Sequence, residues 1–520
     1  MKSPYFTEDH DLFRKTVREF MQNEVRPHLD AWEREQQIPR WIWEKMGEQG
    51  FLGINFPEKY GGSEADFFYS VAFLEELGRC GNGGFATAVS VQQYMATAHI
   101  FQAGSEALKQ KYLTPSIAGQ KIGALAITEP NAGSDVAAIQ TRAERDGDFY
   151  IINGSKTFIT NGFYGDFITL AAKTDASAGM QGITLIVVEK DASGVTSRKL
   201  PKLGWHSSDT AEIAFDNVRV PFANRVGEEG MGFFYIMESF QLERLVAAIA
   251  AVGGAEACLD LTLKYLHERA AFGRPIAKFQ AIRHKMAQLA SELEACKQFV
   301  HHTSWLHDQG EHAVKQCSMA KMLASELSKK IADECLQFFG GYGFMEEYEI
   351  SRMYRDVRGG TIAGGSTEIM LEIIAKTVVD GVSYDKVYDH GAEESPEKDH
   401  SKSDSEERSD MPQTAQEIVR SLPSRLEREK LNGYETVVHL QISGDNGGDF
   451  TVTVSAGECS VVEGLNGEAK CVVKTKDKTY ADIEWGRANP QMAFMTGKIK
   501  ISNLPEMMQF TKMFRRLDST

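Results

Sequence analysis

The sequence contains no closely spaced cysteine pair of the kind that binds a metal. Its 520 residues include seven cysteines, and none of them forms a Cys-x-x-Cys motif. Four histidines share one predicted polar helix, and we interpret them as a solvated face and predict no metal site: His301, His302, His307 and His312. Five cysteines lie in apolar-periodic stretches and are interpreted as buried thiols of a reducing compartment, not as disulfide partners: Cys80, Cys258, Cys296, Cys317 and Cys335.

Basic residues are also fewer than acidic ones. The chain has 57 Lys and Arg against 73 Asp and Glu, which gives a formal net charge of −16. Nucleic acids and anionic membrane surfaces are bound by clustered cations, so this balance argues against both as partners. It does not exclude a small anionic ligand, because a few local Lys and Arg side chains can hold one.

Long hydrophobic runs are absent as well. The segment Met1–Arg26 has no apolar secretory core, and its apolar spacing predicts an amphipathic helix. The most apolar stretch, Leu245–Ala255, ends at Glu256 after about three turns and is too short to span a bilayer. We therefore expect a soluble, cytoplasmic protein.

The glycine patterns of nucleotide-binding loops are missing. No Gly-x-Gly-x-x-Gly follows a predicted strand, and no loop ends in Gly-Lys-Ser/Thr. The cluster Gly340-Gly341-Tyr342-Gly343 lacks the third glycine and follows a helix instead of a strand. A Rossmann-type nicotinamide enzyme is therefore disfavoured.

The chain is too long for one ordinary core, and the spacing of its apolar residues changes along its length. Helical spacing covers residues 1–120, short β-branched runs separated by turns cover 121–231, and helical spacing returns over 232–385. Residues 386–411 are so acidic and poor in apolar side chains that we predict a flexible linker, and 412–520 form a further domain. Since helices and strands are segregated, we predict a multidomain α+β fold with an antiparallel middle sheet.

Five segments carry the functional information. Small residues and hydroxyls after a strand suit the close approach of a flat cofactor, and an aromatic and a threonine two apart in a strand share one face. Each segment alone is weak. The five are Thr128–Asp135, Phe158–Gly162, Gln241–Leu245, Glu268–Pro275 followed by Phe279-Gln280, and Gln337–Gly341 together with Ala363–Glu368.

In order and spacing these segments resemble the acyl-CoA dehydrogenase family, from the first helix to about Asp380. The stretch Leu242-Glu243-Arg244-Leu245 makes the long-chain and isovaleryl branches most similar. The resemblance implies an N-terminal α domain, a middle β domain and a C-terminal four-helix bundle. It also implies an acyl-CoA substrate, FAD, an electron-transfer flavoprotein as electron acceptor, and a homotetramer or at least a homodimer.

The resemblance further implies which residues hold FAD. Thr128 would lie near the pyrimidine edge of the flavin, Phe158 against the ring system, and Thr160 near the reactive nitrogen. Phe158 stands where many members carry Trp; it keeps the stacking and loses an indole N–H. The resemblance also implies that Arg269, Phe272 and Gln280 contact the FAD phosphates and adenosine from a neighbouring subunit. Gln337, Gly340 and Gly341 would make the second subunit's adenine-side contacts. The full implied cofactor set is Leu125, Ile127, Thr128, Gly133, Ser134, Phe158, Thr160, Arg269, Phe272, Gln280, Gln337, Gly340, Gly341, Ser366 and Glu368.

The reaction requires a base that removes the weakly acidic proton next to a thioester carbonyl. A carboxylate can do this when burial raises its pKa and when donors stabilise the thioester oxygen. Many family members carry the base where this chain has Gly364, which cannot act as one, and others carry it on the helix that here holds Glu243. We predict Glu243 as the base, against the simpler interpretation that it pairs with a cation on its own helix. Substrate contacts are expected from Ser134, Arg244, Gly364 and Gly365.

The last domain carries a second resemblance. The apolar patterns of this domain predict a helix at 415–426, strands at 436–442, 450–454 and 469–473, and a closing helix at 505–517. The motif Asn489–Ile501 and this order of elements, from about Pro412 to Leu517, are similar to sterol carrier protein type two. The resemblance implies a lipid tunnel covered by the last helix, which we hypothesise binds fatty acyl-CoA or another lipid; the alternative is an ordinary apolar core. The candidate lining residues are Met492, Phe494, Met495, Met507, Met508, Phe510, Met513 and Phe514.

Two other functions remain open at this point. An acyl-CoA oxidase would return its electrons to oxygen, although oxidases are usually longer. A non-catalytic acyl-CoA or lipid carrier could keep the fold without the chemistry, but the intact cofactor segments and Glu243 argue against it.

Overall fold

The computed structural model describes residues 3–382, 412–428, 431, 434–485, 487, 493, 498–515 and 517. The chain divides into two compact units, Met1–Ala375 and Lys376–Thr520. The predicted linker at 386–411 lies outside the described residues.

The first unit begins with helices. Several start at side-chain caps: Thr7 caps the first helix, Asp66 the fourth and Asn82 the fifth by accepting from backbone N–H groups. Three turns of π-helix interrupt this region. The elements are α1 (Glu8–Phe20), η1 (Met21–Val25), η2 (Arg26–His28), α2 (Leu29–Glu35), α3 (Arg40–Glu48), η3 (Glu58–Tyr60), α4 (Phe67–Arg79), α5 (Gly83–Val91), η4 (Gln92–Ala96), α6 (Thr97–Ala103), α7 (Glu106–Leu108), η5 (Lys109–Leu113) and α8 (Thr114–Ile117).

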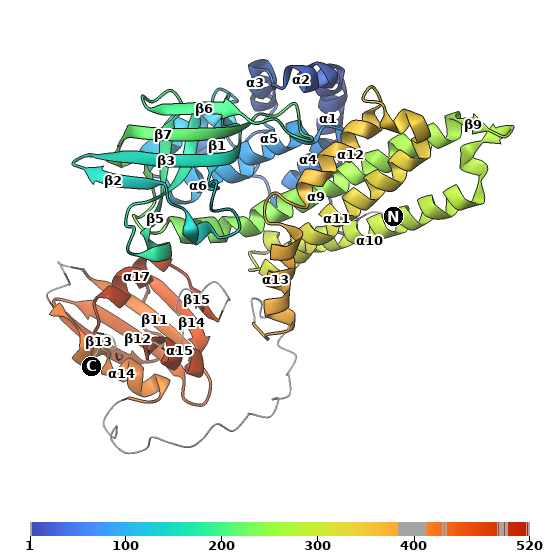
Figure 1. The fold of residues 1–520 in the computed structure, drawn as a ribbon. Coiled ribbons are helices and arrows are strands. Elements are labelled where there is room, and N and C mark those ends of the chain that lie inside the picture. Colours follow the sequence, from blue (N-terminus) through green and yellow to red (C-terminus); the bar gives the residue numbers. More distant parts are fainter. Residues whose placement is uncertain are drawn as a thin grey trace. The chain divides into compact units, whose positions relative to one another are not determined.

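An eight-stranded sheet follows, in the order β6-β7-β3-β2-β4-β5-β8 with β1 paired to β4 (Figure 1). The predicted antiparallel arrangement holds for most pairs, but β1 runs parallel to β4, with Gly123 opposite Phe167. The elements are β1 (Gly123–Ala126), η6 (Val136–Ala138), β2 (Arg142–Asp146), β3 (Phe149–Thr160), β4 (Phe167–Lys173), η7 (Gly179–Gly182), β5 (Ile183–Glu189), β6 (Val195–Lys199), β7 (Thr210–Pro221), η8 (Phe222–Asn224) and β8 (Arg225–Val226).

Long helices complete the first unit, with α9, α10 and α11 running side by side (Figure 1). A short hairpin of β9 and β10 joins α9 to α10. Their bounds are α9 (Gly232–Glu268), β9 (Ala270–Ala271), β10 (Arg274–Pro275), η9 (Ile276–Lys278), α10 (Gln280–Asp308), α11 (Val314–Phe339), η10 (Gly340–Phe344), α12 (Glu349–Gly360) and α13 (Thr367–Val378).

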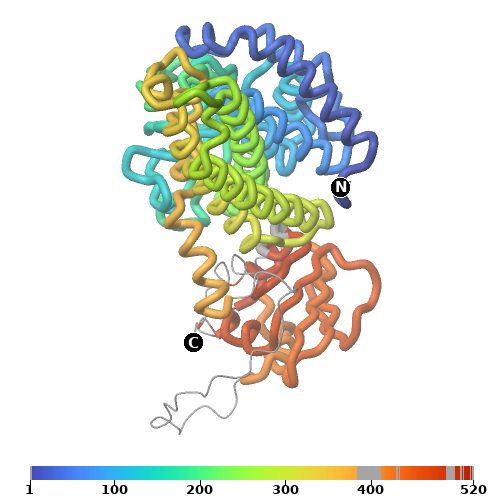
Figure 2. Tube along the Cα trace, turned by 90° about the vertical axis from the view of Figure 1, so that its right-hand side faces the viewer, coloured from blue at the N-terminus to red at the C-terminus, as the bar shows by residue number. Residues whose placement is uncertain are grey.

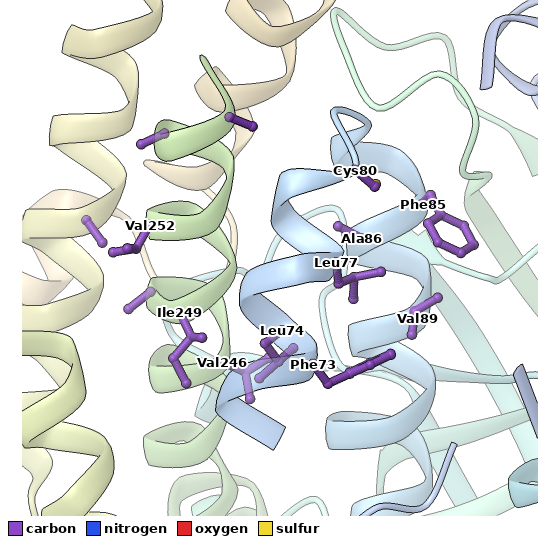
Figure 3. Close-up of a cluster of buried hydrophobic side chains, with 14 of the residues drawn as sticks. Phe73, Leu74, Leu77, Cys80, Phe85, Ala86, Val89, Val246, Ile249 and Val252 are labelled. Atoms are coloured by element: carbon purple, nitrogen blue, oxygen red, sulfur yellow. The ribbon is translucent and has the colours of Figure 1, made fainter. Parts of the chain in front are cut away.

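Helix α9 is the centre of the main hydrophobic core. Leu74 of α4 and Val246 of α9 lie between these two helices, whereas Val252 points to the opposite side of α9 (Figure 3). The start of the chain lies beside α10 (Figure 2), where the rings of Phe6 and His301 are 5.2 Å apart.

Two expectations are corrected by these helices. Within the described residues α9 has the length and mean hydropathy, 1.6, of a membrane span, and 61% of that window is buried inside the protein. The apolar run does not stop at Glu256, because Arg79 and Lys297 donate to its carboxylate at 3.1 and 2.6 Å. His301 does not lie on a solvated face: it is 3% exposed and pairs with Glu75 at 2.7 Å.

None of the seven cysteines, all within the described residues, forms a disulfide, and the five predicted to be buried are buried. This agrees with their interpretation as core thiols. Burial raises the pKa of Cys80 to about 12 and that of Cys296 to about 11, so neither side chain is a thiolate at neutral pH.

The second unit packs helices against a mixed five-stranded sheet in the order β13-β12-β11-β14-β15. The sequence predicted α14, β11, β12, β14 and α17, and missed β13, α15 and β15. Its elements are α14 (Ala415–Arg425), β11 (Thr436–Ser443), β12 (Gly448–Ser455), β13 (Glu458–Glu463), β14 (Cys471–Lys476), α15 (Asp477–Glu484), β15 (Ile499–Ile501) and α17 (Leu504–Lys512).

The proposed lipid-lining residues of this unit are described in part. Met507, Phe510, Met513 and Phe514 are buried in its hydrophobic core beside strands such as β11 and β14. Most of the Asn489–Ile501 motif, including Met492, Phe494 and Met495, lies outside the described residues, as does the side chain of Met508.

Candidate active site

The loop after β1 is fixed by a buried ion pair that sequence reasoning missed. Lys156 of β3 is fully buried and donates to Glu129 Oε1 and to the carbonyl of Ile127, both at 2.8 Å. Burial lowers the pKa of Lys156 to about 8 despite the nearby carboxylate. Burial acts against the charge of Glu129, but Lys156 and hydrogen bonds from Thr141 and the Gln140 N–H hold its pKa below the ordinary value. The feature of the sequence that could have indicated this ion pair is a lysine inside a strand.

This pair leaves the predicted cofactor side of the loop open. Thr157 donates its N–H to the carbonyl of Thr128 at 2.9 Å, which holds the loop against β3. Leu125 and Thr128 are half-buried, Ile127 is buried, and Gly133 and Ser134 are exposed. Nothing in the protein lies within 4 Å of the position a Cβ would take at Gly133. The loop therefore presents backbone to open space, as a cofactor cradle requires.

Phe158 is held in an unusual conformation at the end of the same strand. Its φ is +61°, and its ring is 69% exposed. The pairing of β3 with β7 shifts register between Lys156 and Ile159, so the strand bulges here. Bulky residues rarely adopt this φ, and such strain persists where function requires it. Thr160, two residues on, is half-buried beyond the bulge.

A cavity of about 440 Å³ gathers further predicted residues from two distant segments. Arg269 follows α9, whereas Gln337, Gly340 and Gly341 lie at the end of α11, and all four line the cavity. Added Cβ atoms at Gly340 and Gly341 would meet nothing within 4 Å. The cavity thus offers one cation and bare backbone to a ligand of drug-like size.

Two predicted residues of the α9–α10 connection do not line this cavity. Phe272 is 94% exposed with a φ of +53°, and its ring lies 6.1 Å from that of Phe279. Gln280 is exposed at the first turn of α10. Both face away from the protein's own core, which leaves them accessible to a neighbouring subunit.

Glu243 lies on α9 and is 6% exposed. Burial raises the pKa of its carboxyl to about 8, while the neighbouring Arg244 lowers it. Its Oε1 has no hydrogen-bond partner within the described residues, and Nε2 of the buried His99 lies 4.0 Å from it. A poorly solvated carboxyl of raised pKa has the properties of a proton acceptor for a weak carbon acid.

The glycine loop between α12 and α13 is tied to the bundle by a second buried lysine. Lys321 of α11 is 1% exposed and donates to the carbonyl of Gly365. Burial, and then the charge of Arg244, lowers the pKa of Lys321 to about 8. Lys321 therefore ties the loop to α11, which packs against α9, the helix that carries Glu243. Sequence reasoning missed this residue; the feature that could have indicated it is a lysine among small and apolar side chains on one face of a helix.

Gly364 itself has a φ of +66°, and a Cβ there would meet nothing within 4 Å. The space beside the Gly364 backbone is therefore open. Ser366 lies at the start of α13 and accepts from the Ile369 N–H at 3.5 Å. Glu368 is exposed in the first turn, where hydrogen bonds from its own backbone N–H and from Ser366 lower its pKa.

Comparison with known proteins places this arrangement in a family. Residues 7–120, 124–218 and 230–379 match the N-terminal, middle and C-terminal domain models of acyl-CoA dehydrogenases. Residues 416–515 match the SCP-2 sterol transfer family. The chain belongs to the acyl-CoA dehydrogenase family and carries an additional SCP-2 domain.

Individual relatives support this assignment. The chain is 40% identical over 379 residues to the mitochondrial long-chain specific acyl-CoA dehydrogenase of Sus scrofa, covering 72% of this chain and 87% of that protein. The crystal structure of acyl-CoA dehydrogenase from Geobacillus kaustophilus matches with a TM-score of 0.71 and 45% identity, covering 73% of this chain and all of that one. A glutaryl-CoA dehydrogenase from Mycobacterium smegmatis in complex with FADH2 matches with a TM-score of 0.69 and 29% identity, covering 72% of this chain and 96% of that chain.

Members of the family are FAD-dependent, and the residues present here fit that cofactor. The open backbone at Gly133 gives a flat ring room to approach, and the exposed Phe158 offers an aromatic face. Arg269 provides a cation for a phosphate group, and Gly340 and Gly341 leave open space in the same cavity. The protein is an FAD-dependent acyl-CoA dehydrogenase.

Proposed function

We propose that Glu243 is the base that removes the α-proton when this enzyme oxidises a fatty acyl-CoA to the trans-2-enoyl-CoA. The observation that carries the proposal is the buried, raised-pKa carboxyl with an unpartnered Oε1. An ion pair within α9 was the alternative; Arg244 acts on Glu243 electrostatically, yet Oε1 stays without a hydrogen-bond partner among the described residues.

The chain's own groups then have separate tasks. Glu243 takes the proton from the carbon next to the thioester carbonyl, and the C–H electron pair stays on the substrate. The backbone N–H of Gly364 donates to the thioester oxygen, where negative charge develops, and open space at Gly364 admits the thioester. FAD, when bound, supplies the acceptor for the hydride that leaves the next carbon. Ser134 contacts the CoA arm, with Arg244 and Gly365 completing the substrate surface.

Burial of this site is part of the chemistry. A carboxylate in water is too weak a base for an α-proton, and desolvation increases its proton affinity. Lys321 donates to the Gly365 carbonyl and so restrains the loop that contains Gly364. The proposal therefore assigns catalysis to residues of two segments, α9 and the loop before α13. Helix α11 packs against α9 and holds the loop.

The test is the Glu243→Gln variant, which keeps the shape of the side chain and removes its basicity. Glu238→Gln, the same change on the same helix, is the matched control. With equal FAD content, we expect Glu243→Gln to lose at least three orders of magnitude in the rate of flavin reduction by acyl-CoA. Flavin reduction at a near-normal rate by Glu243→Gln would show that another group is the base.

We further propose that an electron-transfer flavoprotein, and not oxygen, receives the electrons. The family membership supports this, and the competing function is an acyl-CoA oxidase. Oxygen consumption during turnover, compared with reduction of an added electron-transfer flavoprotein, separates the two. Substrate-dependent oxygen uptake at the full turnover rate would identify an oxidase.

We also propose that the SCP-2 domain binds the fatty acyl-CoA or another lipid. Its support is the apolar, flexible side chains of Met507, Phe510 and Met513, which are buried around α17. Removing the chain after Met411 is expected to lower the enzyme's activity with long-chain substrates more than its activity with short ones. An equal effect on both would favour a domain with an ordinary core.

Finally, we propose a homotetramer, or at least a homodimer. Phe272 and Phe344 are 94% and 84% exposed in one chain, and apolar rings of this kind are usually covered by a partner. Phe272 belongs to the segment expected to reach a neighbouring subunit's FAD. Mass measurement in solution by light scattering tests the proposal, and a monomer that retains FAD would contradict it.

A further inference from the structure

His99 of α6 is fully buried next to the proposed base. Its Nε2 lies 4.0 Å from Glu243 Oε1, and neither atom has a hydrogen-bond partner among the described residues. Buried polar side-chain atoms are hydrogen-bonded in the large majority of cases, so two facing atoms without partners need an explanation. Their distance is about 1 Å too long for a hydrogen bond, and a small rotation would close it.

The other side of the histidine ring indicates where its hydrogen lies. Ser239 of α9 is 3.4 Å from His99 Nδ1, and its hydroxyl donates to Gln102 Oε1 at 3.1 Å. Because that hydrogen is used on Gln102, Ser239 Oγ can only accept from the ring. The neutral imidazole therefore carries its hydrogen on Nδ1, and Nε2 presents a lone pair to Glu243.

A lone pair in this position has opposite effects on the two states of the carboxyl. It repels the carboxylate of the resting base, and it accepts a hydrogen bond from the protonated carboxyl. Building on Glu243 as the proposed base, we infer that His99 is a positioning residue that accepts this hydrogen bond and so makes Glu243 a stronger acceptor of the α-proton. The proton leaves the α-carbon, bonds to Oε1 and lies between Oε1 and Nε2, while the C–H electron pair stays on the substrate.

The electrostatic surroundings support a neutral His99. Burial lowers the pKa of His99 to about 4, so the ring is uncharged at neutral pH and its lone pair is available. On α9, Arg244 is the charged side chain that acts on Glu243. Groups on the neighbouring helices are engaged elsewhere: Lys321 of α11 with the Gly365 carbonyl, Tyr94 of η4 with Ser70, and Glu75 of α4 with Arg14 and His301.

Two variants test the inference. His99→Leu removes the lone pair. Ser239→Ala removes the acceptor for Nδ1–H, so the ring hydrogen can move to Nε2 and donate to the carboxylate. Both changes should lower the proton affinity of Glu243 through different atoms. His302→Leu, at an exposed histidine stacked on Trp305, is the matched control.

The first readout is the pH profile of flavin reduction in the FAD-loaded enzyme. The rate requires ionised Glu243 and therefore rises with pH. In His99→Leu and Ser239→Ala we expect this rise to move to lower pH by roughly one pH unit, which is the strength of about one buried hydrogen bond. The high-pH plateau should fall roughly threefold, since a weaker base transfers a proton more slowly. A purely structural role would lower the plateau and leave the rise in place.

The second readout needs no turnover. The carbonyl stretch of protonated Glu243, identified in infrared difference spectra by its loss in Glu243→Gln, should titrate at lower pH in both variants than in the wild type and in His302→Leu. A titration midpoint identical to the wild type in Ser239→Ala would overturn the inference, even if His99→Leu failed to fold. If Glu243→Gln still reduced flavin, the base assignment itself would fail, and the two failures are distinguishable.

Discussion

Lys156 Nζ lies 2.8 Å from Glu129 Oε1, and both side chains are buried between β3 and the loop after β1. This pair connects β3, which carries Phe158 near its end, with the loop after β1, which carries Ser134. The two predicted flavin-binding segments are therefore held together by a contact that neither segment shows by itself.

Removing only one partner of this ion pair should lower the stability of the protein strongly. Lys156→Met leaves a buried carboxylate without its cation, and we expect a loss of about 3–5 kcal/mol in stability together with loss of FAD. Thermal unfolding and FAD content of the purified variant measure both effects. The double variant Lys156→Met/Glu129→Gln should recover much of the stability, and an equal loss in the double variant would show that charge is not the reason.

Phe158 should respond to substitution in two opposite ways. Phe158→Gly relieves the left-handed backbone, so the FAD-free protein should gain about 1 kcal/mol, while loss of the ring should weaken FAD binding. Unfolding of the FAD-free protein and fluorescence titration with FAD give the two quantities. A variant that binds FAD as well as the wild type would mean that the exposed ring serves another surface.

Arg269 should contribute to FAD affinity through its charge. The cavity that it lines with Gly340 and Gly341 suits a phosphate group, and loss of one charge-assisted hydrogen bond weakens binding by roughly tenfold or more. Arg269→Gln should therefore release FAD during dialysis faster than the wild type does. Arg274→Gln is the control, because Arg274 packs on Phe279. Equal FAD loss in both variants would point to a general effect of charge.

Glu75 should control unfolding in acid. Burial opposes its charge, but hydrogen bonding to His301 and the charge of Arg14 lower its pKa from 4.5 to about 2. A depressed folded-state pKa adds stability that is present above pH 4.5 and is lost as the pH falls towards 2, on the order of 3 kcal/mol in total. Stability curves of Glu75→Gln should be flatter over this interval than those of the wild type or the exposed control Glu19→Gln. If the stability of Glu75→Gln fell with pH as steeply as that of the wild type, the assignment of this acid dependence to Glu75 would be wrong.

The sequence predicted the order of the domains well because its apolar periodicity changes between regions. It failed where the deciding contact is far away along the chain. His301 looked like part of a polar face, and only its pairing with Glu75, 226 positions earlier, explains its burial. Strand β13 was missed because its side chains are largely exposed, so it shows no regular apolar alternation.

The same reasoning applies to the site. Glu243 and Gly364 could be proposed from the sequence because a missing side chain at one position suggested a base at the other. Lys156, Lys321 and His99 could not, since a polar residue on an apolar face has no assigned partner until the fold brings one to it. Each of the three acts on a predicted residue. The predicted set therefore contained residues of the site but lacked the side chains that hold or tune them.

The most direct test of the account is exchange of the α-hydrogen of acyl-CoA with solvent deuterium, followed by mass spectrometry under anaerobic conditions. The wild-type enzyme should incorporate deuterium at the α-carbon, and Glu243→Gln with the same FAD content should incorporate none above the solution background. Exchange by Glu243→Gln at the wild-type rate would contradict the claim that this carboxyl takes the α-proton.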